Sequence, residues 1–351
     1  MHRILIRKPG RYDALEWVEE PDPTPGPDEV VIETEACGVN YADGIIRMGL
    51  YRSAKELHGY PITPGFEVAG RIVAMGRNAS TLGTDDWNRE LRIGDRVIGL
   101  TLFNGYATHV KLPVQGVFKQ PKALDALQAA TTPTVFLTAW WMVHRQVHPE
   151  PGETWLVHSA AGGVGSALLQ LARLAGVHAI GVVGAPHKVK HAKAMGAAAV
   201  IDRSRDDLWS EAKRLAPEGF HAVFDATGVA TLAQSYAHLA PTGRLVVYGF
   251  HSMLPNNGRL NWLRLGLDWL RTPRFNPLKM TSENRSVLAA NLSFLQVHGP
   301  KLRQGMCWLL DRFETGQLQA LPVETFALKD AGEAQRRIES GQTVGKLALE
   351  A

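Results

Sequence analysis

Residues 158–176, HSAAGGVGSALLQLARLAG, decide the fold of this chain. They follow the apolar segment TWLV (154–157) and continue into apolar residues at helical spacing. We therefore expect a strand, a glycine turn and a helix in that order. Gly162 would let the backbone approach a pyrophosphate closely, and Gly165 would let the helix pack tightly on a sheet. The free N–H groups at the start of the helix suit phosphate oxygens, and the residues expected to bind there are Ala161, Gly162, Gly163, Val164 and Gly165.

Ala160 stands where the usual dinucleotide pattern has its first glycine, so a glycine turn that only packs is the alternative. The flanking sequence favours the dinucleotide. Strand-like runs at 178–184, 198–202, 221–227 and 243–249 alternate with helical patterns, which predicts an α/β fold with a doubly wound parallel sheet. Ligands bind at the carboxyl ends of such strands. We expect Thr227, Tyr248 and Gly249 to border the cofactor there.

The end of the second strand indicates which dinucleotide is bound. An NAD site usually has a carboxylate at this position, but here the strand ends at Val183, Gly184 and Ala185. Lys188 follows, and Arg203 lies just beyond the third strand. Because lysine and arginine attract a 2′-phosphate, NADP(H) is the predicted cofactor, with Gly184, Lys188 and Arg203 at its phosphate. A solvated helix face is the alternative for Lys188.

Length and composition exclude several classes of protein. At ~150 residues per domain, 351 residues predict two domains. Two cysteines indicate a reducing compartment, so a cytoplasmic protein is expected. The net charge of +4 comes from scattered residues, which does not indicate nucleic acid. No run reaches the ~18 apolar residues of an integral membrane span.

Residues 1–120 read as β-rich, and several motifs give them a family resemblance. CGVNYADGIIRMGLY (37–51), PITPGFEVAGRI (61–72) and AAGGVG (160–165) together resemble the medium-chain dehydrogenase/reductase superfamily, in its zinc-independent quinone oxidoreductase branch. Residues 276–349 resemble the vesicle amine transport protein subgroup. The resemblance implies a β-rich GroES-like catalytic domain split between 1–122 and 292–351, and a Rossmann NADP-binding domain at 123–291. It also implies a homodimer, for which SVLAANL (286–292) is a plausible edge strand.

The resemblance also suggests site residues. Asn40 and Phe66 occupy positions where zinc-dependent relatives have metal ligands, so no metal is expected. Tyr51 and Asn40 are the candidate catalytic residues, because a hydroxyl and an amide can donate to a developing oxyanion. An aromatic lid and a loop-capping amide are the respective alternatives. Asp43 and Arg47 are expected to form an ion pair or to brace their loop. Family positions near the cofactor are occupied by Thr138, with a helix-bonded threonine as its alternative, and by Lys346.

Three functions follow from this. The first is an NADPH-dependent reductase of a quinone or enone acceptor. The second is an enoyl thioester reductase. The third is a membrane- or lipid-associated, nucleotide-binding protein with little activity, suggested by the basic, tryptophan-bearing segment 259–280, RLNWLRLGLDWLRTPRFNPLKM. A cover for the cleft or a dimer seam is the alternative for that segment.

Overall fold

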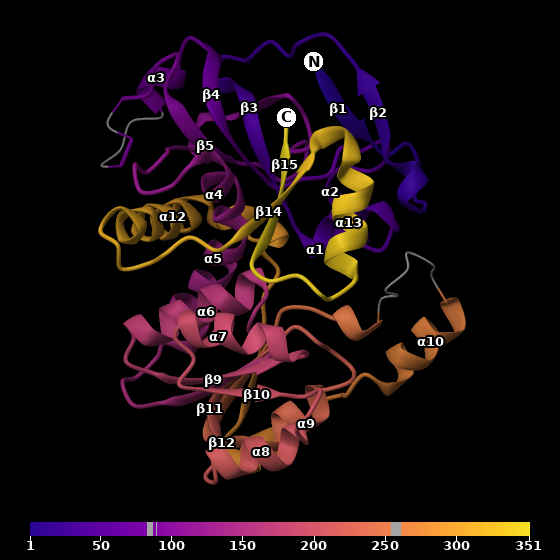
Figure 1. The fold of residues 1–351 in the computed structure, drawn as a ribbon, viewed down its shortest axis with the longest axis vertical. Coiled ribbons are helices and arrows are strands. Elements are labelled where there is room, and N and C mark those ends of the chain that lie inside the picture. Colours follow the sequence, from indigo (N-terminus) through magenta and orange to yellow (C-terminus); the bar gives the residue numbers. More distant parts are fainter. Residues whose placement is uncertain (83–86, 89, 254–260) are drawn as a thin grey trace. The chain divides into compact units, whose positions relative to one another are not determined.

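The computed structural model describes the whole chain except residues 83–86, 89 and 254–260. It contains two compact units (Figure 1). The first comprises Met1–Leu137 and Ser293–Ala351, and the second comprises the described part of residues 138–292. Among the described helices, none is both long enough and apolar enough to cross a membrane.

The second unit is built on a parallel six-stranded sheet in the order β10-β9-β8-β11-β12-β13. Its strands are β8 (Thr154–Val157), β9 (His178–Val183), β10 (Ala199–Asp202), β11 (Phe220–Asp225), β12 (Leu239–Val247) and β13 (Ser286–Ala289). The connecting helices are α6 (Gly163–Leu174), α7 (Val189–Ala194), α8 (Leu208–Leu215) and α9 (Leu232–Ala237), followed by α10 (Trp262–Arg271) and α11 (Pro277–Glu283). The direction of winding reverses at β8. Right-handed crossovers therefore place α6 and α7 on one face and α9 on the other. This confirms the predicted doubly wound sheet.

Apolar side chains from the strands and helices form the core of this unit. Leu156, Ile180, Val223 and Leu245 come from four different strands and pack in one buried cluster. On α6, Leu168, Leu169 and Leu171 are buried against the sheet, as the helical spacing predicted. Burial of these side chains contributes roughly 1.5–3 kcal/mol each. The strand ends are thereby held as a rigid edge on which a site can form.

The first unit contains a mostly antiparallel sheet in the order β14-β15-β3-β4-β5-β7, with β6 also paired to β3. Its strands are β3 (Glu29–Val39), β4 (Glu67–Met75), β5 (Arg96–Leu100), β6 (His109–Pro113), β7 (Val117–Lys119), β14 (Val323–Ala327) and β15 (Lys346–Glu350). A hairpin of β1 (His2–Leu5) and β2 (Glu16–Glu19) lies beside them. The helices include α1 (Tyr41–Arg47), α2 (Arg52–Leu57), α3 (Ala79–Leu82), α12 (Gly299–Glu314) and α13 (Ala331–Glu339).

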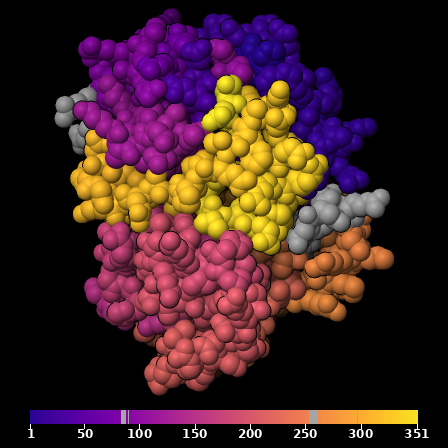
Figure 2. All heavy atoms as spheres, in the orientation of Figure 1, coloured from indigo at the N-terminus to yellow at the C-terminus, as the bar shows by residue number. Residues whose placement is uncertain are grey.

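The C-terminal residues belong to the sheet of the N-terminal residues. β15 pairs with β3, with Leu347 opposite Val39. In the space-filling view the yellow C-terminal segment lies against the purple and indigo residues of the same unit (Figure 2). The helix α4 (Ala126–Thr131) and the first half of α5 (Pro133–Trp141) also pack in this unit, so the two units divide after Leu137. The domain boundaries at 122/123 and 291/292 stay predictions.

Candidate functional site

The glycine turn between β8 and α6 has the local geometry of a phosphate loop. Gly162 is the N-cap of α6, and a Cβ added to it would meet only the carbonyl oxygen of Ser159, at 3.3 Å. A Cβ on Gly165 would lie 2.3 Å from that oxygen. Gly165 is therefore required for packing, whereas Gly162 leaves space beside the N–H groups of α6 for a ligand.

The replacement of the first glycine by Ala160 has a structural explanation. Ala160 is fully buried, and its N–H donates to the carbonyl of Val182 on β9. The facing residue of β9 is Gly181, where a Cβ would lie 2.9 Å from the Ala160 methyl. The methyl of Ala160 thus occupies space that Gly181 leaves free, and the turn keeps its shape.

The predicted 2′-phosphate residues gather at the carboxyl ends of β9 and β10. The exposed Arg203 donates its backbone N–H to Val183, and its Nε lies 3.4 Å from the Cβ position of Gly184. Lys188 is half-buried at the N-cap of α7, three residues after Ala185. The structure therefore brings Gly184 and Arg203 together, with Lys188 on the turn that follows β9.

The carboxyl ends of β11 and β12 are held by a buried network around Asp225 that sequence reasoning missed. Oδ1 of Asp225 accepts from the N–H groups of Thr227 (2.8 Å) and Gly228 (3.1 Å), and Oδ2 accepts from the hydroxyl of Ser235 (2.7 Å). Ser235 also contacts Nε2 of His158 at 3.2 Å, and burial lowers the pKa of this histidine. Because all of these side chains are buried, we assign them to holding the strand ends rather than to chemistry.

The same edge has unused hydrogen-bonding groups. The hydroxyls of Tyr248 and Ser252 are buried without a hydrogen-bond partner, and burial raises the pKa of Tyr248. Gly249 lies beside Ala226, where a Cβ would meet the Ala226 carbonyl at 2.9 Å. These two hydroxyls are donors that a polar ligand at this edge can use. Thr138, the remaining predicted cofactor residue of this unit, is half-buried on α5.

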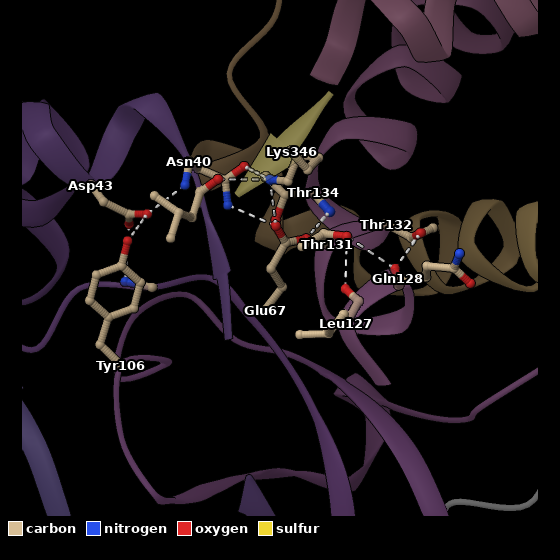
Figure 3. Close-up of polar contacts among 12 residues, drawn as sticks. Asn40, Asp43, Glu67, Tyr106, Leu127, Gln128, Thr131, Thr132, Thr134 and Lys346 are labelled. Atoms are coloured by element: carbon tan, nitrogen blue, oxygen red, sulfur yellow. Dashed lines mark hydrogen bonds and ion pairs between the residues drawn. The ribbon is translucent and has the colours of Figure 1, made fainter. Parts of the chain in front are cut away.

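In the first unit, Asn40, Glu67 and Lys346 form a buried cluster (Figure 3). The ammonium of Lys346 donates to Oδ1 of Asn40 (2.7 Å), to Oε1 of Glu67 (2.9 Å) and to the carbonyl of Val39 (2.9 Å). Nδ2 of Asn40 donates to the same Glu67 oxygen at 2.8 Å, and Oε2 of Glu67 accepts from the N–H of Thr134 at 2.7 Å. All three N–H groups of Lys346 thus donate inside this unit. Of the two N–H groups of the Asn40 amide, one donates to Glu67 and the other is not used within this cluster.

Asp43 and Arg47 brace their loop, but through other partners than each other. Asp43 accepts from the N–H groups of Asn40 (2.8 Å) and Gly65 (3.1 Å) and from the hydroxyl of Tyr106 (2.9 Å). Burial raises the pKa of Asp43 to about 7, against the lowering effect of these donors. Arg47 pairs with Glu339 of α13 at 2.6 Å instead. Of the two expected roles, bracing of the loop agrees with these contacts, whereas the carboxylate that pairs with Arg47 is that of Glu339 and not that of Asp43.

Tyr51 lies half-buried at the N-cap of α2. Its hydroxyl is 2.9 Å from the hydroxyl of Ser293, 242 residues away, which no local signal in the sequence indicates. Its ring meets Phe66 edge to face at 6.1 Å between centroids, and Phe66 packs in turn on Phe103. The described residues contain no group of three or more histidine, cysteine, aspartate or glutamate side chains placed to hold a metal ion.

Comparisons with known proteins identify the family and the fold of this chain. Residues 26–122 match the family model of the alcohol dehydrogenase GroES-like domain, and residues 163–272 match that of zinc-binding dehydrogenases. The chain is 30% identical to the synaptic vesicle membrane protein VAT-1 homolog of Rattus norvegicus, over 97% of this chain and 81% of the relative.

Solved structures are similar over the whole chain. Quinone oxidoreductase from Escherichia coli, complexed with NADPH, has a TM-score of 0.84 at 25% identity and 100% coverage of both chains. The CurK enoyl reductase has a TM-score of 0.81 at 29% identity, covering 99% of this chain and 98% of that one. The predicted GroES-like fold is thereby confirmed. The chain belongs to the medium-chain dehydrogenase/reductase superfamily, in the branch that contains the quinone oxidoreductases and the VAT-1-like proteins.

Proposed function

We propose that this protein is an NADPH-dependent, zinc-independent oxidoreductase that reduces a quinone or another α,β-unsaturated carbonyl compound. The observation that carries the proposal is at the carboxyl ends of the strands in the six-stranded sheet. The phosphate-type turn follows β8 there, and Gly184 and Arg203 follow β9 and β10 of the same sheet. A bound NADPH would supply the hydride. The similarity to a quinone oxidoreductase complexed with NADPH supports the same choice of cofactor.

Each cofactor residue has a distinct proposed role. The N–H groups of 161–165 bind the pyrophosphate, since the start of α6 carries a partial positive charge and Gly162 leaves room for the phosphates. Arg203 and Lys188 bind the 2′-phosphate, which a carboxylate at the end of β9 would repel. Thr227, Tyr248 and Gly249 border the remaining part, and the hydroxyl of Tyr248 is available to it. Thr138 stays a predicted contact near the nicotinamide.

The residues at the former zinc positions support chemistry without a metal. Phe66 has no lone pair and packs against Tyr51 and Phe103. Asn40 has its amide oxygen and one N–H bound to Lys346 and Glu67. Both positions thus serve packing or internal hydrogen bonds.

Tyr51 is the better supported of the two catalytic candidates. Its hydroxyl has a hydroxyl partner, Ser293, that can hold it in one orientation while it donates a proton to a developing oxyanion. Asn40 is better placed to position β3 and the start of α1. Lys346 acts through Asn40 and Glu67 in this proposal, since its ammonium makes three internal hydrogen bonds.

The test is NADPH oxidation followed by absorbance against a panel of quinones, enones and enoyl thioesters, with NADPH binding measured separately. We expect oxidation with at least one acceptor, and a much lower kcat in Tyr51→Phe at unchanged NADPH affinity. Binding of NADPH without oxidation by any acceptor would contradict the enzymatic part. Preference for enoyl thioesters would support the second candidate function, which the similarity to an enoyl reductase favours.

The remaining predictions concern assembly and location. β13 is the terminal strand of its sheet. We propose that two copies pair along it in a homodimer, because an exposed edge strand offers unpaired backbone groups. Sedimentation of the wild type against a variant with Leu288→Pro in β13 tests this. A cytoplasmic location stays a prediction.

A further inference from the structure

The helices α6 and α7 pack side by side in the second unit (Figure 1). The hydroxyl of Ser166 lies 2.9 Å from Nε2 of His191, and Nε2 of Gln170 lies 3.5 Å from the sulfur of Met195. The two pairs are four residues apart in both segments, which is about one helical turn. The helices are therefore packed in register, and their first contact is a polar pair.

The Ser166–His191 pair lies inside the protein. Ser166 is fully buried, and its backbone N–H already donates to Gly162 at 2.8 Å. His191 is half-buried, and burial lowers the pKa of this histidine. A lowered pKa keeps the imidazole neutral at pH 7, so the ring carries a single N–H proton. His191 therefore acts on Ser166 as a hydrogen-bonding group and not as a charge.

The hydroxyl of Ser166 also reaches the phosphate turn. It lies 3.3 Å from the carbonyl oxygen of Ala160, to which it donates. A hydroxyl has one hydrogen, so the contact with His191 must then be made by the histidine N–H. Nε2 of His191 is thus the donor, and the hydrogen bonds run from His191 through Ser166 to Ala160. The opposite direction would leave the Ala160 carbonyl without the hydroxyl.

The carbonyl of Ala160 sets the direction of the next N–H group. The peptide between Ala160 and Ala161 is planar and trans, so its carbonyl and its N–H point in opposite directions. Ala160 and Gly162, on either side, donate their own N–H groups to backbone carbonyls at 3.0 and 2.9 Å. The N–H of Ala161 has no acceptor among the described residues. It is a donor that a phosphate oxygen can use, and the bond from Ser166 fixes where it points.

We propose that His191 is a positioning residue for the pyrophosphate of the cofactor. Through Ser166 it holds the peptide between Ala160 and Ala161, so that the N–H of Ala161 faces the phosphate oxygens. This role rests on the proposed function, which assigns the N–H groups of 161–165 to the pyrophosphate. His191 is 25 residues from Ser166 and lies outside the glycine turn, so the pattern of the turn does not indicate it.

The alternative role for His191 is support of the 2′-phosphate. Lys188 is the N-cap of α7, three residues before His191, so the same contact also fixes the helix that follows Lys188. The two roles predict different ligand dependence. An effect through Ala161 changes the affinity of every ligand with a pyrophosphate and spares adenosine 2′-monophosphate, which has none. We favour the pyrophosphate because the hydrogen bonds of Ser166 lead to Ala160.

Calorimetric titration of the full chain with NADPH, NADH and adenosine 2′-monophosphate tests the proposal. His191→Leu removes the N–H donor and should raise the Kd for NADPH and for NADH by the same factor, roughly threefold to tenfold, with adenosine 2′-monophosphate unchanged. His191→Gln keeps an N–H donor and should stay within about twofold of the wild type. Ser166→Ala should give the same rise as His191→Leu, and the double variant should show no further rise.

Two controls separate this effect from loss of the fold and from the 2′-phosphate. His178→Leu changes an exposed histidine at the amino end of β9 and should leave all three Kd values unchanged. Arg203→Ala should give the complementary result, with weaker binding of NADPH and adenosine 2′-monophosphate and little change for NADH. Thermal melting shows which variants keep the fold, and we expect His191→Leu and His191→Gln to melt with the wild type.

Three results would overturn the proposal. The first is unchanged affinity for NADPH and NADH in a folded His191→Leu. The second is a His191→Gln variant that binds as weakly as His191→Leu, which would show that the N–H donor is not the reason. The third is an equal loss for adenosine 2′-monophosphate and NADPH, which would assign His191 to the support of Lys188.

Failure of this role and failure of the reductase proposal are distinguishable, because these readouts concern binding alone. A wild type that binds NADPH but oxidises it with no acceptor would contradict the reductase activity and leave the role of His191 in place. A wild type that binds neither dinucleotide would contradict both.

Discussion

Removal of the Lys346 ammonium should destabilise the first unit strongly. The ammonium donates to Glu67, Asn40 and Val39 at 2.7–2.9 Å, and the side chains of Lys346 and Glu67 are 4% and 0% exposed. In Lys346→Met the methionine fills most of the space, so the cavity is small. The carboxylate of Glu67 is left buried with only the N–H groups of Asn40 and Thr134. Breaking one side of such a buried pair costs about 3–5 kcal/mol.

A double-mutant cycle isolates the ion pair from the cost of each substitution. Glu67→Gln alone should also be destabilising, because it leaves the Lys346 ammonium buried without a carboxylate to balance its charge. Lys346→Met/Glu67→Gln removes both charges and should be more stable than Lys346→Met alone, with a coupling energy of at least about 2 kcal/mol. Urea unfolding followed by far-ultraviolet circular dichroism measures all four proteins. Since the two units can unfold in separate transitions, the transition that shifts in Lys346→Met is the one to compare.

An exposed pair provides the matched control. Lys119 lies 3.1 Å from Asp95, but the two side chains are 36% and 29% exposed. Solvent screens this pair, so Lys119→Met should cost no more than about 1 kcal/mol. The reasoning is refuted if the losses of unfolding free energy in Lys346→Met and Glu67→Gln sum to that of the double variant within about 0.5 kcal/mol. It is also refuted if Lys119→Met costs as much unfolding free energy as Lys346→Met.

Four further predictions follow from the site. Arg203→Ala should raise the Kd for NADPH roughly tenfold or more while changing that for NADH little, and equal losses would show that Arg203 does not contact the 2′-phosphate. Gly162→Ala should keep the thermal stability of the wild type but lose NADPH affinity, whereas Gly165→Ala should lower the melting temperature itself, because only its Cβ would clash with backbone, at 2.3 Å. Ser293→Ala should lower kcat more than it changes KM, and adding it to Tyr51→Phe should cause no further loss; additive losses would separate the two hydroxyls. The pKa of Asp43 rises in the folded state from 3.8 to about 7, so its contribution to stability is present below about pH 4 and is lost as the pH rises through about 7. Urea unfolding at several pH values should show this loss in the wild type and not in Asp43→Asn.

The amphipathic pattern at 262–271 shows the limit of reading a helix from its sequence. Spacing along the chain determines which residues of a helix share a side, and in α10 Trp262, Leu263 and Leu270 share one. It did not indicate that this side faces outward. That depends on packing, which half-buries Leu265 and Asp268 on the other side of the helix.

The sequence by itself determined the second unit and its cofactor edge. The turn at 158–165, the alternation of strands and helices and the missing carboxylate after Val183 are all local features, and neighbouring residues set backbone conformation and crossover direction. Gly184 and Arg203 follow consecutive parallel strands, so their proximity could be inferred from chain order alone.

Only the tertiary structure decided the partners in the first unit. Lys346 meets Asn40 across 306 residues, Arg47 meets Glu339 across 292, and Tyr51 meets Ser293 across 242. The first two contacts exist because β15 pairs with β3 and α13 packs near α1. A residue type states which hydrogen bonds it can make, but the packing of distant segments decides which partner comes within reach. For that reason Asn40 and Tyr51 were equal candidates from the sequence, and our preference for Tyr51 rests on their different partners in the structure.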